Sequence, residues 1–261
     1  MNYKEVIKIL EKAQVKGAAV EIDLKKLPEY IKYKNAKLVE KKVRHGIRLA
    51  QELINSSNLD KAEKILNEVE DISDEEEYMG SVWEKRGWIA DARDKWDKEI
   101  KYFEKAREIY KTIPGSTEVE GHKDDRILTV KHFTGRALYF RGKKSDLTKC
   151  EKLFTDNLAE YKKLKHHDAV GFNYFWLART YIAMKNVKKA EEMARLAMKY
   201  FDKTSNQSFS FRIMAEVNMA RGEKEKAIEN ATESLRYILP AGTYYNGVIE
   251  AVKYIIEASL L

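Results

Sequence analysis

Three arginines, Arg136, Arg179 and Arg212, carry the binding chemistry that stands out most in this sequence. A guanidinium group is planar and permanently charged, and its donors match the two oxygens of a carboxylate or the oxygens of a phosphate. Aromatic side chains near these arginines supply rigid apolar area of the kind that dominates binding hot spots. These residue types predict recognition of an acidic ligand more strongly than they predict catalysis.

Residues suited to catalysis are few. His166, His167 and Asp168 have metal-binding side chains, but adjacent histidines rarely bind one ion, and no third ligand cluster lies nearby in the sequence. The single cysteine, Cys150, is expected to be a buried structural thiol rather than a reactive one. The chain has no glycine-rich phosphate loop, CxxC pair or G-x-S-x-G motif. We therefore expect no enzymatic activity, no cofactor and no metal.

The positive charge is concentrated at the N-terminal end. The net charge is +7, and residues 1–50 hold 13 Lys and Arg against 6 Asp and Glu, while the remainder holds 36 of each sign. A basic end can bind nucleic acid or an acidic partner, although it is more often a solvated helix face. A nucleic-acid-associated protein is thus an alternative, and its candidate contacts are Lys25, Lys26, Lys41, Lys42 and Arg44.

Composition indicates an all-α protein of the cytoplasm. Only three prolines and twelve glycines interrupt 261 residues, so long stretches can be helical. One cysteine allows no intramolecular disulfide, which suits a reducing compartment. The charged residues between Lys4 and Glu11 exclude a signal peptide there, and no stretch approaches the ~20 apolar residues of a membrane span. We expect no membrane association, and homo-oligomerisation stays open.

The stretch from Phe172 to Lys203 shows the clearest periodic pattern. Apolar and small residues form two stripes at the helical period, separated by the polar turn Lys185-Asn186. The first stripe contains Tyr174, Leu177, Ala178 and Tyr181, and the second contains Val187, Ala190, Ala194, Ala197 and Met198. This pair resembles the tetratricopeptide repeat (TPR), a helix–turn–helix unit of about 34 residues. Tyr174, Ala178 and Ala194 stand where that family has Trp, Gly and Phe.

Similar stripes recur about five times, in a divergent form. The comparable small positions on the second helices are Ala62, Glu99, Cys150, Ala190 and Ala227. Glu99 is the one residue of this set that is not small. Either that helix is longer than usual or the register there is shifted by one residue. Ser73 to Glu76 has capping-box form and predicts a helix start.

The resemblance implies a right-handed superhelical solenoid of antiparallel helix pairs, with about 11–13 helices and at most two short strands. We expect basic capping helices in residues 1–42, repeats in 43–241 and a C-terminal capping helix in 242–261. The first capping helix would use Tyr3, Val6, Ile7 and Leu10.

In the TPR family the first helix of each pair lines a concave groove, which implies where a ligand would bind. The groove residues expected here are Arg48, Trp88, His132, Arg136, Tyr139, Phe175, Trp176, Arg179 and Arg212. A solvated arginine in a groove supports little core, so Arg179→Ala is expected to weaken binding and leave the fold intact. The competing interpretation is that Phe133, Phe175 and Trp176 are core residues and that the arginines pair with Glu160, Glu191 or Glu216.

The resemblance therefore predicts a non-enzymatic adaptor that binds an acidic protein or peptide segment. The residues of the chaperone-binding carboxylate clamp found in some TPR proteins are absent. A remote alternative is an α-helical hydrolase, because Arg126 to His132 fits the loose R-x4–6-H pattern of a helical ribonuclease family.

Overall fold

The computed structural model describes residues 23–113, 116–117, 121–201, 206–238 and 245–260. The expected first capping helix, from Tyr3 to Leu10, lies outside these residues. Packing divides the described chain into two compact units. We call residues 23–142 the N-terminal unit and residues 143–260 the C-terminal unit.

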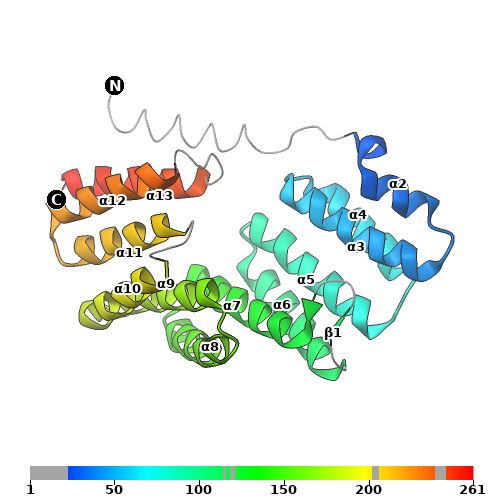
Figure 1. The fold of residues 1–261 in the computed structure, drawn as a ribbon, viewed down its shortest axis with the longest axis horizontal. Helices are drawn as coiled ribbons and strands as arrows, with labels where there is room; N and C mark the ends of the chain where they lie inside the picture. The colour runs from blue at the N-terminus through cyan, green and yellow to red at the C-terminus, as the bar shows by residue number, and fades with distance from the viewer. Residues whose placement is uncertain (1–22, 114–115, 118–120, 202–205, 239–244, 261) are drawn as a thin grey trace. The chain divides into compact units, whose positions relative to one another are not determined.

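The N-terminal unit is built from helices that pack against their neighbours in sequence (Figure 1). A two-residue antiparallel strand pair precedes the last helix, with Ser116 opposite His122. The elements are a 3-10 turn η1 (Leu24–Lys26), α2 (Pro28–Asn35), α3 (Val39–Asn55), α4 (Leu59–Glu70), α5 (Glu76–Ala92), α6 (Trp96–Thr112), β1 (Ser116–Thr117), β2 (Gly121–His122) and α7 (Lys123–Arg141).

The C-terminal unit consists of helices joined by short turns in the residues described, and it follows the same plan (Figure 1). Helix α9 packs on both α8 and α10, and α11 packs on α10 and α12. Its helices are α8 (Lys144–Lys163), α9 (His167–Ala183), α10 (Val187–Phe201), α11 (Gln207–Ala220), α12 (Lys224–Ile238) and α13 (Tyr245–Leu260). The described residues of the two units thus contain twelve α-helices and one strand pair, within the predicted range.

The register of the repeats is confirmed by burial. The comparable positions on α4, α6, α8, α10 and α12 are all completely buried, namely Ala62, Glu99, Cys150, Ala190 and Ala227. Glu99 therefore occupies the position reserved for a small residue in the other pairs, and no shift of register is needed. A buried carboxyl at a helix contact is costly when it is ionised and unpaired.

Glycines let aromatic rings approach the first helices closely. A Cβ atom built on Gly171 of α9 would lie 2.5 Å from a ring carbon of Phe201 on α10. Gly87 of α5 stands in the same relation to Phe103 of α6, with 2.6 Å to the ring. The small residue of the first helix and the large residue of the second thus interlock in both units.

A helix begins within the stretch Ser73 to Glu76, as predicted, but the predicted cap is wrong. Ser73 does not cap α5, which begins at Glu76. The Ser73 hydroxyl instead accepts a hydrogen bond from the backbone N–H of Glu75 at 3.4 Å, in the bend before the helix. A short break separates the first two helices, because α2 ends at Asn35 and α3 begins at Val39.

Ala190→Glu is expected to destabilise the C-terminal unit by several kcal/mol, because the new carboxyl would be buried at the close contact of α9 and α10. Thermal or denaturant unfolding monitored by circular dichroism measures the change. The control is Lys188→Glu, which adds a carboxylate to the same helix at an exposed position. Equal stability of the two variants would contradict the helix register.

Candidate ligand-binding site

Helices α9 and α11 bring two of the predicted arginines onto one aromatic surface. The guanidinium of Arg179 lies over the rings of Phe175 and Trp176, with its central carbon 4.9 and 5.2 Å from the two ring centres. The guanidinium of Arg212 lies 4.3 Å above Phe209 on the same helix. Both guanidinium groups thus lie against ring faces, which attract cations.

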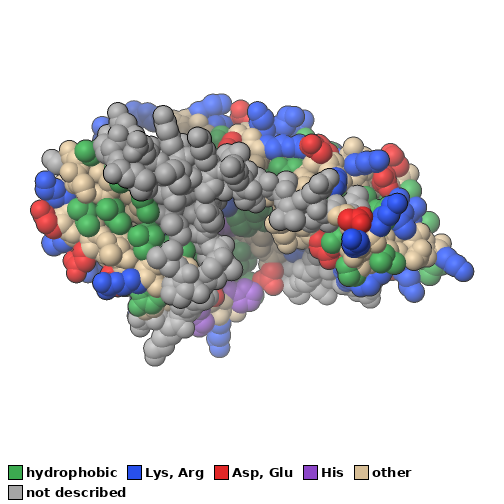
Figure 2. All heavy atoms as spheres, turned by 90° about the horizontal axis from the view of Figure 1, so that it is seen from above, with side chains coloured by type: hydrophobic (Ala, Val, Ile, Leu, Met, Phe, Trp, Pro, Cys, Tyr) green, Lys and Arg blue, Asp and Glu red, His purple; other side chains and the backbone are tan. Residues whose placement is uncertain are grey.

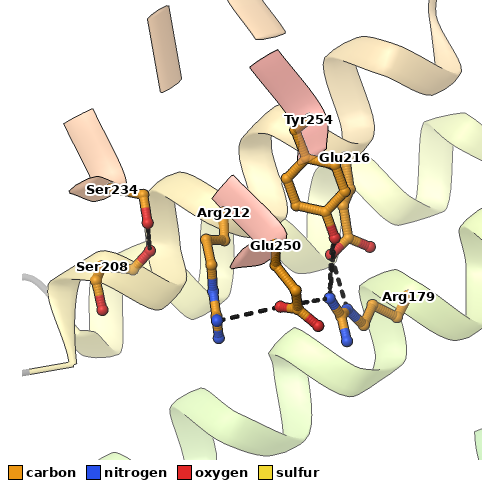
Figure 3. A network of polar contacts seen from close by, with 7 residues as sticks. All are labelled: Arg179, Ser208, Arg212, Glu216, Ser234, Glu250 and Tyr254. Atoms are coloured by element: carbon orange, nitrogen blue, oxygen red, sulfur yellow. Dashed lines mark hydrogen bonds and ion pairs between the residues drawn. The ribbon is translucent and has the colours of Figure 1, made fainter. Parts of the chain in front are cut away.

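Carboxylates from two further helical positions complete this surface (Figure 3). Glu216 of α11 accepts hydrogen bonds from Nε of Arg179 at 2.8 Å and from the Tyr254 hydroxyl at 2.6 Å. Glu250 of α13 lies 3.2 Å from Arg179 and 3.1 Å from Arg212, so it bridges the two arginines. We call Arg179, Arg212, Glu216, Glu250 and Tyr254 the C-terminal arginine cluster.

The cluster is charge-balanced and largely closed to solvent. Arg179 and Arg212 are 5% and 6% exposed, and two carboxylates offset their charges. Burial works against the charge of Arg179, but Glu216 and Glu250 hold its pKa well above the usual value. Burial also raises the pKa of Tyr254, so its hydroxyl stays protonated and donates to Glu216. The cluster is therefore a set of charge-assisted hydrogen bonds inside a low-dielectric region.

Arg212 is less well satisfied than Arg179. Its buried Nε has no hydrogen-bond partner among the described residues, and Glu250 is the carboxylate paired with its guanidinium there. Burial and the like charge of Arg179 together lower the pKa of Arg212. The cluster thus retains one buried donor that a further acceptor would stabilise.

A related arrangement lies within the N-terminal unit. The guanidinium of Arg136 on α7 lies 4.8 Å above the ring of Phe133, which meets Trp88 of α5 edge-on at 4.1 Å. Arg136 forms an ion pair with Asp91 of α5 and is 20% exposed at its side chain. This site is more accessible than the C-terminal arginine cluster. We call Trp88, Asp91, Phe133 and Arg136 the N-terminal arginine cluster.

The two clusters share a local pattern. Phe133, Trp176 and Phe209 each stand three positions before an arginine on the same helix. Residues three apart on a helix are neighbours on its surface. Each ring accordingly lies under the guanidinium that follows it in sequence, beneath Arg136, Arg179 and Arg212 respectively. An aromatic-x2-Arg step therefore builds the same feature on α7, α9 and α11.

The remaining predicted groove residues lie in the N-terminal unit. His132 contacts the Phe133 ring edge-on, and Tyr139 contacts the Phe140 ring edge-on further along α7. Arg48 is exposed on α3. The sequence-predicted set therefore divides into an N-terminal group, namely Arg48, Trp88, His132, Arg136 and Tyr139, and a C-terminal group, namely Phe175, Trp176, Arg179 and Arg212.

The residues that sequence reasoning missed are Glu250 and Tyr254. They lie four positions apart on α13 and therefore on one face of that helix. Nothing in the sequence pairs this face with α9, because Arg179 and Tyr254 are 75 positions apart. Glu216 was anticipated as an internal partner of an arginine, and it is hydrogen-bonded to Arg179.

Glu99 lies beside the N-terminal arginine cluster. It is completely buried, and neither carboxyl oxygen has a hydrogen-bond partner among the described residues. The nearest guanidinium nitrogen of Arg136 is 3.9 Å away, beyond hydrogen-bond range. Burial, reinforced by the negative charges of Asp91 and Asp94, raises the pKa of Glu99 to about 8. Glu99 is thus mainly protonated at neutral pH.

Two residues that the sequence offers for catalysis, Arg126 and Cys150, are buried within the helical packing. Arg126 is buried and pairs with Glu84 at 2.9 Å, and Glu84 also accepts a hydrogen bond from Tyr110 at 2.7 Å. Cys150 is buried in α8, at its position in the repeat register. No group of three His, Cys, Asp or Glu side chains within the described ranges is placed to hold a metal ion.

Acidic neighbours offset part of the basic N-terminal region. Lys32, Lys34 and Arg44 form ion pairs with Glu29, Glu68 and Glu40 at 2.7, 3.7 and 2.6 Å. Figure 2 shows acidic side chains among the lysines and arginines on the face it presents. Of the helices described, none is both long enough and apolar enough for a bilayer crossing.

Comparison with known proteins gives matches by structure. No family model matches the sequence, and no curated protein matches it significantly. BtubC (BKLC) from P. vanneervenii superposes with a TM-score of 0.62 at 16% identity, covering 94% of each chain.

Two further structures extend the likeness. The nearly identical TPR-like repeats of a P. anserina protein assigned as a kinesin light chain superpose with a TM-score of 0.58 at 18% identity. The match covers 80% of this chain and 99% of that one. The third structure is a Pyrococcus horikoshii signal-transduction ATPase with numerous domains, which has a tetratricopeptide repeat sensor. It superposes with a TM-score of 0.62 at 18% identity, and the match covers 99% of this chain and 39% of that one. With its consecutive helix pairs and these structural neighbours, the chain has the TPR-like all-α solenoid fold.

Proposed function

We propose that this protein is a cytoplasmic, non-enzymatic adaptor that binds an acidic segment of a partner protein through its arginine clusters. The observation that carries the proposal is the aromatic-x2-Arg step, which places a guanidinium over a ring on α7, α9 and α11. Each of these guanidinium groups is already paired with a carboxylate of the chain itself. A partner that supplies carboxylates would use the same chemistry.

The N-terminal arginine cluster is the more accessible of the two clusters. Trp88, Phe133 and Arg136 are all partly exposed, and Asp91 is the carboxylate that an incoming acidic side chain would replace or join. A partly desolvated arginine–carboxylate pair contributes about 1.5–3 kcal/mol. One such contact therefore accounts for a tenfold to hundredfold effect on affinity, at ~1.4 kcal/mol per factor of ten.

Arg136→Ala is expected to weaken binding of a co-purifying partner protein by roughly tenfold to a hundredfold. The partner is identified by pull-down of the intact protein after nuclease treatment, and its affinity is then measured by titration. Arg93→Ala is the matched control. Arg93 also lies in the N-terminal unit and pairs with the acids Asp60 and Glu63, but no aromatic ring of the described residues lies beneath its guanidinium. Unchanged affinity of Arg136→Ala protein would contradict the proposal.

The alternative of nucleic-acid binding rests on Lys25 and Lys41, which are exposed in the basic N-terminal region. Its signature is different, because release of counterions makes nucleic-acid affinity fall steeply with salt. A partner lost on nuclease treatment, with binding that weakens by orders of magnitude between low and physiological salt, would favour this alternative over the adaptor.

A further inference from the structure

The C-terminal arginine cluster differs from the N-terminal one in the origin of its carboxylates. Arg136 pairs with Asp91, which belongs to the helix pair directly preceding α7. Arg179 pairs with Glu216 of the neighbouring helix α11, but Arg179 and Arg212 also receive Glu250 from α13, the final described helix. In Figure 3, Glu250 and Tyr254 extend from α13 toward Arg179, and Arg212 approaches Glu250 from α11. The acidic side chain on the aromatic surface is therefore presented by a helix.

We propose that α13 is the resident occupant of a helix-binding site, and that the partner is an acidic helical segment which competes with α13 for Arg179 and Arg212. This inference rests on the proposed function and specifies the ligand. The segment would carry a carboxylate and, four residues later, a hydroxyl that donates to Glu216, as Glu250 and Tyr254 do on α13.

Helix α13 satisfies Arg212 incompletely, which favours its replacement by a better-matched helix. Glu250 is one carboxylate shared between two guanidinium groups, at 3.2 and 3.1 Å. The buried Nε of Arg212 remains without a hydrogen-bond partner among the described residues. Arg179 also has Glu216 as a partner, so the incomplete contact is that of Arg212. A helix that offers Arg212 a further acceptor would satisfy this donor, so it would bind the same surface more completely than α13 does.

The competitor also has to overcome the covalent attachment of α13. A segment tethered to its own site acts at a high effective concentration, which is millimolar for short flexible connections. A free peptide with the sequence of α13 should accordingly bind the intact wild-type protein poorly. It should bind well once the side chains that hold the resident helix have been removed.

The test uses the full chain and a labelled synthetic peptide of residues 245–260. In the variant Glu250→Ala/Tyr254→Phe, the peptide is expected to bind about tenfold tighter, or more, than it binds the wild-type protein. A control peptide carrying Glu250→Gln and Tyr254→Phe should not show this gain. Hydrogen exchange of residues 245–260 in the protein should be faster in the variant than in wild type, while the amides of α9 remain protected.

The outcomes separate this inference from the proposed function. Equal binding of the peptide to wild type and variant would overturn competition by α13, although recognition of acidic segments would stand. Failure of the peptide to bind the variant, with α13 shown to be released, would overturn the inference, and Arg136→Ala then tests the proposed function independently. If the double variant loses its helical signal, Tyr254→Phe alone keeps Glu250 on both arginines and should give a smaller gain in the same direction.

Discussion

Arg179→Ala is expected to lower the free energy of unfolding of the C-terminal unit by about 3–5 kcal/mol, because it removes the buried guanidinium that balances the largely buried carboxylate of Glu216. Glu216 would lose its guanidinium partner, and Glu250 would keep only Arg212. The expectation from sequence that this substitution leaves the fold intact assumed a solvated arginine, whereas Arg179 is 5% exposed. Urea unfolding monitored by circular dichroism measures the loss.

Two further variants sharpen this prediction. Arg221→Ala removes a more exposed arginine of the same unit, paired with Glu191 at 2.6 Å, and should cost no more than about 1 kcal/mol. Arg179→Met with Glu216→Leu replaces both members of a buried pair by apolar groups and should recover much of the loss. Arg179→Ala protein as stable as Arg221→Ala protein would show that the C-terminal arginine cluster contributes little to the fold.

Glu99→Gln is expected to stabilise the protein by several kcal/mol at alkaline pH. The pKa of Glu99 is about 8 in the folded protein, against an ordinary value of 4.5. The folded state therefore holds a proton that the unfolded state releases, and stability present below pH 4.5 is lost as the pH rises toward 8. The loss reaches about 1.4 kcal/mol per pH unit, and glutamine, which does not ionise, removes it.

Glu84→Gln is the matched control and should act in the opposite direction. Glu84 is also buried, but Lys85 and Arg126 overcome the effect of burial and lower its pKa to about 2. Its ionised form stabilises the folded state above pH 4.5, and this contribution is lost as the pH falls toward 2. Glu84→Gln should therefore destabilise at neutral pH, and unfolding measured from pH 5 to 9 distinguishes the two variants. A pH-independent difference between Glu99→Gln and wild type would contradict the assignment.

Periodicity predicted the fold because it reports which residues face the core. Ala190 and Ala227 were placed from spacing alone, and both are completely buried on second helices. Glu99 looked like an error of register because a carboxyl is costly to bury, yet it occupies the expected position. Spacing therefore predicted the position of Glu99 correctly, whereas its residue type was misleading. Burial raises the pKa of the Glu99 carboxyl, and the neutral carboxyl costs less to bury than a charged one.

The candidate site was predicted only in part, for a physical reason. The aromatic-x2-Arg steps are local, so Arg179 and Trp176 could be placed together from helical geometry. The low exposure of Arg179 could not be predicted in this way, because it depends on Glu250, which is 71 positions away on α13. Contacts between distant helices are set by tertiary packing, which leaves no periodic signal in either segment.

Displacement of α13 by an acidic partner can be followed directly while the partner binds. Hydrogen exchange of the intact wild-type protein is measured alone and with a saturating amount of the co-purified partner protein. We expect residues 245–260 to exchange faster in the complex, while α9 and α11 become at least as protected as before, because the partner replaces α13 on Arg179 and Arg212. Unchanged protection of α13, together with full binding of the partner, would contradict the proposal that the partner competes with α13 for Arg179 and Arg212.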